Sequence, residues 1–138
     1  MSGRCLTEKC SAESPSVVSS APSIDLLWWS AAHGAAERAK EEFMALPASA
    51  RGKLLKTIER YLKGDSRRQD VRPLAEGIRE WRCREGNNHF RALFIRWGDA
   101  CVVLTVFYKN QQRTPPQDME RARSRAKAWR RSRGSSPA

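Results

Sequence analysis

The sequence predicts an α+β domain, in which a small antiparallel sheet carries a packed N-terminal helical hairpin and a C-terminal basic helix. Two segments of helical periodicity precede three strand-like segments joined by short turn signals, and another helix signal follows the last strand. At 138 residues the chain is long enough to bury one core without disulfides or metal. We expect that domain to span residues 24–132, between a disordered leader of residues 1–23 and a flexible tail of residues 133–138.

The first elements follow from composition and periodicity. Residues 1–23 carry few large apolar side chains, so burial cannot offset the entropy that they would lose on ordering. The apolar segment IDLLWWS, residues 24–30, is the first strand candidate. Residues 33–46 predict a helix, because small and apolar side chains recur on one helical face until Pro47 ends the pattern.

A second helix is expected over residues 48–64. Leu54 and Ile58 belong to its apolar face, and Gly64 suits a left-handed C-terminal stop. Residues 65–73 carry both charge signs without apolar periodicity, which predicts a loop between the helical layer and the sheet.

Three strands are then predicted as consecutive hairpins. Residues 77–84 alternate between two faces, residues 85–88 (EGNN) are typical of a tight turn, and residues 89–97 form the partner strand. Residues 98–99 turn the chain again. Residues 100–109 are apolar on both faces, which predicts a central strand.

A last helix is expected after these strands. Thr114 suits the N-cap, Pro115 suits the first helical position, and Gln117 completes a capping box. After Glu120 the helix contains basic residues and no acid: Arg121, Arg123, Arg125, Lys127, Arg130, Arg131 and Arg133.

Charge is unevenly distributed along the chain. Of the 26 Lys and Arg, 11 precede Val71, as do 9 of the 15 Asp and Glu, so the first half carries about +2 and the second about +9. Clustered bases gain free energy by displacing counterions from phosphates. The second half therefore indicates a polyanionic partner, and a solvated basic surface is the alternative.

Cysteine spacing and hydropathy exclude several classes of site. The four cysteines lack the C-x-x-C spacing of a zinc site and the chain has two histidines, so we expect no metal and no other cofactor. No apolar segment reaches membrane-spanning length, and the N-terminus has no signal-peptide pattern. We expect a cytoplasmic protein with reduced thiols and no membrane partner.

The candidate site is a group of side chains that consecutive hairpins would bring to one end of the sheet. The chain has no Gly-rich phosphate loop, no H-E-x-x-H motif and no nucleophile elbow. The converging residues are Arg82, Arg84, His89, Arg91, Tyr108 and Lys109. A sheet end with cations, one phenol and one imidazole suits a phosphodiester substrate.

RNA cleavage through the neighbouring 2′-hydroxyl would use these residue types. The reaction requires removal of the hydroxyl proton, stabilisation of the charged phosphorane, and a proton for the departing 5′-oxygen. Arginine suits the second task, because its fork of donors matches two phosphate oxygens. Neighbouring cations lower the pKa of a lysine, so Lys109 could accept the first proton, and Tyr108 or His89 could assist the leaving group.

Each of these residues also has a structural alternative. Arg91 could cap the sheet edge or pair with Glu80. Lys109 could be a solvated strand end, and His89 a hairpin histidine with satisfied hydrogen bonds. Tyr108 could be a core aromatic.

The motifs between residues 77 and 125 together resemble the phage-derived HigB-like branch of the RelE/ParE toxin superfamily, and the likeness runs from about Leu26 to Trp129. That branch shows a Gly-hydrophobic-x-Glu-hydrophobic-Arg strand, an aromatic-Arg strand, an F-x-K-K motif, a Thr-Pro helix start and an Ala-x-x-Arg helix. The corresponding elements here are Gly77 to Arg82, Phe90-Arg91, Phe107 to Asn110, Thr114-Pro115 and Ala122 to Arg125.

The resemblance implies a RelE-like fold and the toxin of a type II toxin-antitoxin pair, an endoribonuclease that inhibits translation by cutting mRNA on the ribosome without metal. It implies that Arg91 stabilises the phosphorane, that Lys109 acts as base or charge stabiliser, and that Arg82 binds phosphate. The second lysine of the F-x-K-K motif is Asn110 here, and Arg113 could restore its charge.

Further nucleic-acid contacts are expected from residues of the sheet end, of the segment after it and of the basic helix: Arg84, His89, Arg113, Arg121 and Arg125. The partners follow from the resemblance. The implied partners are a cognate antitoxin, commonly an Xre-type helix-turn-helix protein, and the ribosome with its mRNA. Two alternatives stay open: a ParE-like toxin that binds DNA gyrase without cleaving RNA, and a non-catalytic RNA-binding protein.

Overall fold

The computed structural model describes residues 24–109 and 114–134 and confirms the α+β class over them. The elements are β2 (Asp25–Trp28), α2 (Arg38–Met44), α3 (Ala48–Leu62), β3 (Val71–Pro73), β4 (Arg79–Glu85), β5 (Asn88–Trp97), β6 (Ala100–Lys109) and α4 (Pro116–Arg133). The strands form one five-stranded sheet in the order β2-β6-β5-β4-β3. The expectations for the leader, for residues 110–113 and for residues 135–138 lie outside the described residues.

The predicted hairpins are present, and two other strands differ from the prediction. β4, β5 and β6 pair as consecutive antiparallel strands, with β6 between β5 and β2. β2 runs parallel to β6, so the sheet is not wholly antiparallel. The loop predicted over residues 65–73 contains β3, an edge strand of three residues that ends in proline and is too short to show alternation.

The two N-terminal helices are close to their predicted places. α3 occupies most of the predicted segment. α2 begins at Arg38 rather than at residue 33, because the chain first makes a turn in which Gly34 has a φ of +82°.

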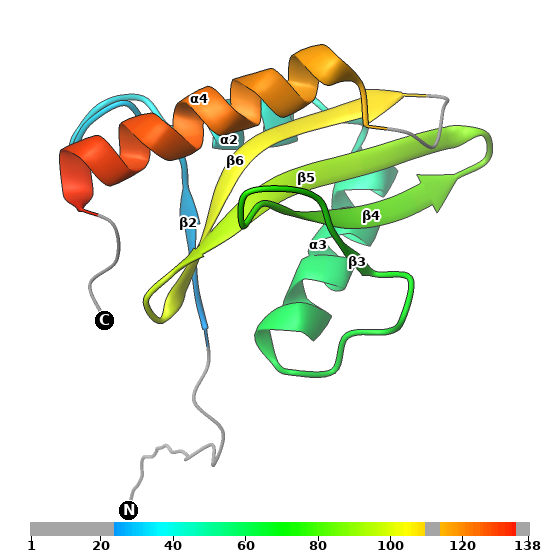
Figure 1. The fold of residues 1–138 in the computed structure, drawn as a ribbon. Coiled ribbons are helices and arrows are strands. Elements are labelled where there is room, and N and C mark those ends of the chain that lie inside the picture. The colour runs from blue at the N-terminus through cyan, green and yellow to red at the C-terminus, as the bar shows by residue number, and fades with distance from the viewer. Residues whose placement is uncertain (1–23, 110–113, 135–138) are drawn as a thin grey trace, which may run out of the picture.

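Each face of the sheet has its own apolar core, with α2 and α3 on one side and α4 on the other (Figure 1). On the α3 side, the Trp81 and Phe94 rings stack with centroids 3.6 Å apart, and Tyr61 meets both rings edge-on. On the opposite side, α4 packs against the sheet through Ala122 and Trp129. Among the helices in the described part of the chain, none is both long and apolar enough to cross a bilayer.

The predicted cap of the last helix is wrong. α4 begins at Pro116 with Pro115 as its N-cap, and no side chain caps it. Thr114 Oγ1 instead donates to Glu80 Oε2 at 2.7 Å. Glu80 is fully buried, so its carboxylate would lose a hydrogen bond that water cannot replace, whereas the Asp118 and Met119 N–H groups of the first turn already donate to the Pro115 carbonyl.

A β-bulge divides β6 into two parts. Leu93 of β5 pairs with Thr105, whereas Phe94 pairs with Val103, so Leu104 is an extra residue on β6. Side chains alternate between the two faces of a sheet. The extra residue therefore moves every later position of β6 to the face opposite the one that strict alternation predicts.

Side chains from two helices support the strand at this bulge, where β2 has ended opposite Val103. Glu42 Oε1 of α2 accepts a hydrogen bond from the Val106 N–H at 3.1 Å. Arg125 of α4 donates to the Leu104 carbonyl at 2.8 Å and forms an ion pair with Glu42 at 2.9 Å. This Glu42–Arg125 clasp satisfies edge groups that a neighbouring strand would otherwise bind.

We expect Glu42→Ala to lower the free energy of unfolding by about 1–3 kcal/mol, because the Val106 N–H and Arg125 both lose an acceptor. Urea denaturation measures the change. Glu41→Ala is the matched control, since Glu41 is exposed and its ion pair with Arg38 is long, at 3.8 Å. Its effect should stay within about 0.5 kcal/mol, and equal losses in the two variants would contradict a role for the clasp.

Candidate nucleic-acid interface

The strand register brings the predicted cations together at one end of the sheet. Directly opposed residues on antiparallel strands have Cβ atoms about 5 Å apart. Two rows of Cα partners cross β4, β5 and β6: Arg82–Arg91–Phe107 and Arg84–His89–Lys109. These two cation rows concentrate positive charge next to the turn between β4 and β5.

The bulge decides which residue of β6 joins the second cation row. Without the extra residue, strict pairing from Val103 would place Tyr108 opposite His89. In the observed register Lys109 pairs with His89, and Tyr108 pairs with Phe90. Tyr108 is 54% exposed and its ring stacks on Phe90, with centroids 5.5 Å apart, on the α3 side of the sheet. The register thus separates Tyr108 from the other predicted site residues.

Arg91 is buried, with 1% of its surface exposed. Its Nη1 lies 3.4 Å from Oε2 of the fully buried Glu80, and it donates to Thr114 Oγ1 at 3.4 Å. Burial lowers the pKa of Arg91, an effect that the charge of Glu80 opposes. The pairing with Glu80 that we weighed as a structural alternative is therefore present.

His89 has an unusual electrostatic environment at the end of β5. Burial is the largest cause that lowers its pKa, followed by the positive charges of Arg91, Arg84 and Arg82, while Glu80 raises it weakly. The imidazole is therefore neutral at pH 7. A neutral imidazole can accept a proton. The neighbouring cations can bind the anionic group of the same substrate that gives up this proton.

The two residues predicted on α4 are partly engaged within the fold. Arg125 belongs to the Glu42–Arg125 clasp, its side chain is 15% exposed, and its guanidinium lies 4.7 Å from the Trp29 ring centroid. Arg121 donates to Asp118 at 2.7 Å while 40% of its side chain stays exposed. Arg113, the remaining predicted contact, lies outside the described residues.

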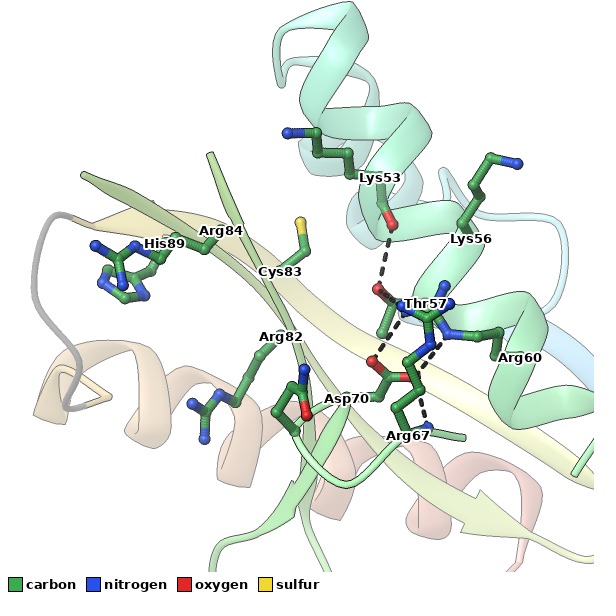
Figure 2. Close-up of a pocket in the computed structure, with 11 residues that line it drawn as sticks. Lys53, Lys56, Thr57, Arg60, Arg67, Asp70, Arg82, Cys83, Arg84 and His89 are labelled. Atoms are coloured by element: carbon green, nitrogen blue, oxygen red, sulfur yellow. Dashed lines mark hydrogen bonds and ion pairs between the residues drawn. The ribbon is translucent and has the colours of Figure 1, made fainter. Parts of the chain in front are cut away.

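A basic pocket that the sequence analysis missed lies between α3 and the outer edge of β4 (Figure 2). Its volume is about 550 Å³. His89 and the acid Asp70 both line it. The Lys and Arg side chains that line it are Lys53, Lys56, Arg60, Arg67, Arg82 and Arg84. Arg82, Arg84 and His89 therefore belong both to this pocket and to the cation rows.

A periodic signal in the sequence could have indicated this pocket. Lys53, Lys56, Arg60 and Lys63 recur every three or four residues and so occupy one face of α3. Such a stripe is usually the solvated face of an amphipathic helix. Periodicity alone could not show that part of this stripe faces a strand edge with further arginines. Within the ranges that the structure describes, no three His, Cys, Asp or Glu side chains cluster as metal ligands would.

Comparison with known proteins adds independent findings. Residues 41–127 match the family model described as "Phage derived protein Gp49-like (DUF891)". Two curated proteins from Mycobacterium tuberculosis, strains CDC 1551 / Oshkosh and ATCC 25618 / H37Rv, are 48% identical to this chain over 98 residues. Both are named "Probable endoribonuclease HigB1", and the alignment covers 71% of this chain and 78% of each relative. Residues 41–127 include the cation rows and every residue that lines the basic pocket.

We expect Arg84→Gln to raise the pKa of His89, because it removes one of the positive charges that disfavour the imidazolium. NMR titration of the His89 ring protons measures the shift. Arg96→Gln is the control, since Arg96 is an exposed cation at the other end of β5 and should leave the His89 pKa unchanged. An unchanged or lower His89 pKa in Arg84→Gln would contradict the electrostatic coupling.

Proposed function

The chain belongs to the phage-derived Gp49-like family of HigB-like toxins, and on this premise we propose that it is an endoribonuclease that cuts mRNA on the ribosome and so inhibits translation. Membership of the family confirms the resemblance drawn from the motifs of residues 77–125. The family match and the identity to the two relatives support a toxin of a toxin-antitoxin pair.

The observation that carries the proposal is the register of the two cation rows. It unites residues from three strands in a cluster whose charge suits a phosphodiester. The relatives' name supports the reaction class, and the charge of the cluster supports its assignment as the site of that reaction.

In the proposed reaction the 2′-oxygen attacks the adjacent phosphorus, the P–O5′ bond breaks, and the products are a 2′,3′-cyclic phosphate and a 5′-hydroxyl. His89, neutral at pH 7, accepts the proton of the attacking hydroxyl, and water donates the proton that turns the departing 5′-oxygen into the 5′-hydroxyl. Arg82 binds the phosphate, and Lys109 offsets the charge that develops on the phosphorane. None of these steps uses a metal.

Arg91 is assigned a positioning role rather than the direct phosphate contact that the resemblance implied. Its 1% exposure leaves little surface for a substrate, and Glu80 and Thr114 hold its guanidinium. Burial is the largest cause that lowers the pKa of His89, and the charge of Arg91, from the centre of the first cation row, lowers it further. Arg91 thus influences the reaction through the pKa of His89 and not through contact with the substrate.

Partners follow from the class of protein. A toxin of this kind is paired with a cognate antitoxin, and we propose a small helix-turn-helix protein of the Xre type for that role. The ribosome presents the mRNA, and exposed bases such as Arg84 and Arg121 contact nucleic acid around the cut.

The direct test adds purified protein to ribosomes programmed with a defined mRNA and maps the new 5′ ends. We expect cleavage by the wild type, and a kcat/KM about 100-fold lower for Arg82→Gln, because one transition-state contact to the phosphate is lost. Arg96→Gln is the control and should cut normally. Intact message with the wild type would overturn the proposal, and gyrase-dependent DNA breaks in expressing cells would favour the ParE-like alternative.

A second test separates positioning by Arg91 from direct contact. We expect Arg91→Ala to lower the free energy of unfolding by about 3–5 kcal/mol, because it removes the buried cation of the Glu80 carboxylate and leaves it the longer contact with Arg72, at 3.9 Å. The double variant Glu80→Gln/Arg91→Gln removes both charges and should recover most of that stability, measured by urea denaturation. Under the positioning role the double variant also recovers cleavage to within about 10-fold of wild type and has a raised His89 pKa. A stable double variant that stays about 100-fold less active would show direct contact instead.

A further inference from the structure

The charges that line the basic pocket are only partly neutralised within the fold (Figure 2). Arg60 binds both carboxylate oxygens of Asp70, at 2.8 and 2.9 Å, and the Arg67 N–H also donates to Asp70 at 2.9 Å. These contacts lower the pKa of Asp70, with the Arg60 hydrogen bond as the largest cause. The one acid of the lining is therefore already committed to Arg60.

The remaining cations of the pocket are available to a ligand. Lys53 lies 3.5 Å from Glu85 and is half exposed. No carboxylate within the described residues forms an ion pair with the side chains of four others: Lys56, Arg67, Arg82 and Arg84. Like charges held together without counter-charges raise the free energy of the fold, and a bound anion lowers it.

The position of the pocket connects it to the cation rows. β3 begins at Val71 opposite Trp81, and just before it the Asp70 carbonyl accepts from the Arg82 N–H at 2.9 Å, so the outer edge of β4 is not covered by a strand beyond Arg82. The pocket occupies this uncovered edge and extends to Lys56 and Arg67 on the side of α3. A chain of phosphates bound at the cation rows can therefore continue past Arg84 into the pocket.

We infer that the basic pocket is a second phosphate-binding subsite, which holds the RNA backbone next to the scissile nucleotide through Lys56 and Arg67. This inference rests on the proposed function, because it extends the same substrate beyond the point of cleavage. RNA crosses the β4 edge, with the scissile phosphate at Arg82 and the neighbouring backbone between α3 and the loop that carries Arg67. Lys53 adds charge at the rim of the subsite.

The chemistry of the lining favours RNA over an acidic protein segment. Docked protein segments usually anchor through apolar or aromatic side chains in a desolvated pocket. Apart from Cys83, the uncharged side chains of this lining are Thr57, Gln69 and the polar imidazole of His89, none of which is a large apolar anchor. Phosphate backbones are bound by charge and hydrogen bonds alone, which this lining supplies.

The test uses a single-stranded RNA with 2′-O-methyl groups, which cannot be cleaved, and follows its binding by fluorescence anisotropy at several salt concentrations. Each of Lys56→Gln and Arg67→Gln should reduce the slope of log K against log salt by about 0.7, the value for one lost phosphate contact on a single strand. Lys40→Gln is the matched control, because Lys40 is an exposed lysine of α2 that does not line the pocket. Its slope should equal that of the wild type.

Cleavage on programmed ribosomes supplies a second readout. The double variant Lys56→Gln/Arg67→Gln should raise KM several-fold and leave kcat within about 2-fold of wild type, because the subsite binds ground state and transition state alike. A loss of kcat with unchanged KM would overturn the inference, as would slopes equal to that of Lys40→Gln.

The outcomes also separate this inference from the proposed function. If the wild type cuts message and the pocket variants behave like Lys40→Gln, the inference fails and the proposed function stands. If the wild type cuts nothing, the proposed function fails, and reduced salt slopes in the pocket variants alone would still support an RNA subsite. Binding of a poly-glutamate peptide through Lys56 and Arg67, with no binding of RNA, would overturn the inference in favour of a protein-docking site.

Discussion

The buried ion pair between Glu80 and Arg91 constrains the arrangement of the whole functional end of the sheet. Two charges removed from water are tolerated only when each has its partner, and loss of one leaves the other at a large cost in free energy. The pair links β4 to β5, and the bond from Thr114 brings in the residue that precedes α4. A one-residue slip of β5 would point Arg91 into the aromatic core around Trp81, so the pair fixes a single register. Both cation rows depend on that register.

The bulge in β6 acts on the same rows from the other side. It adds Leu104 to one strand and so aligns Lys109, rather than Tyr108, with Arg84 and His89. Bulges often redirect side chains next to active sites, and this one is held by the Glu42–Arg125 clasp. Side chains of α2 and α4, from opposite faces of the sheet, therefore meet at the edge of β6 and support the bulge. The bulge in turn aligns Lys109 with Arg84 and His89. Packing far from the cation rows determines their composition.

The sequence predicted the elements that alternation and turn signals encode, and it missed those that depend on contacts between distant segments. The hairpins of β4, β5 and β6 and the convergence of Arg82, Arg91 and His89 followed from connectivity. The choice between Tyr108 and Lys109 did not, because a bulge has no reliable signal in a strand that is apolar on both faces. The prediction of Thr114 as the N-cap was wrong for a similar reason, because its hydroxyl donates instead to the buried carboxylate of Glu80, 34 residues earlier in the chain.

The most basic segment of the sequence uses part of its charge within the fold. On α4, Arg125 supports a strand edge, and Arg133 stacks over Trp129 at 3.8 Å while it donates to Ser30. A guanidinium used in this way has fewer N–H donors left to bind an anion, because some of them already donate to protein acceptors. In the described residues, both places keep bases that form no ion pair with a carboxylate: Lys56 and Arg67 in the basic pocket, and Lys127, Arg130 and Arg131 on α4. The charge that a surface offers to RNA is therefore the charge left after the fold has used its own, and by that measure the edge of β4 offers cations that the run of arginines in the sequence does not indicate.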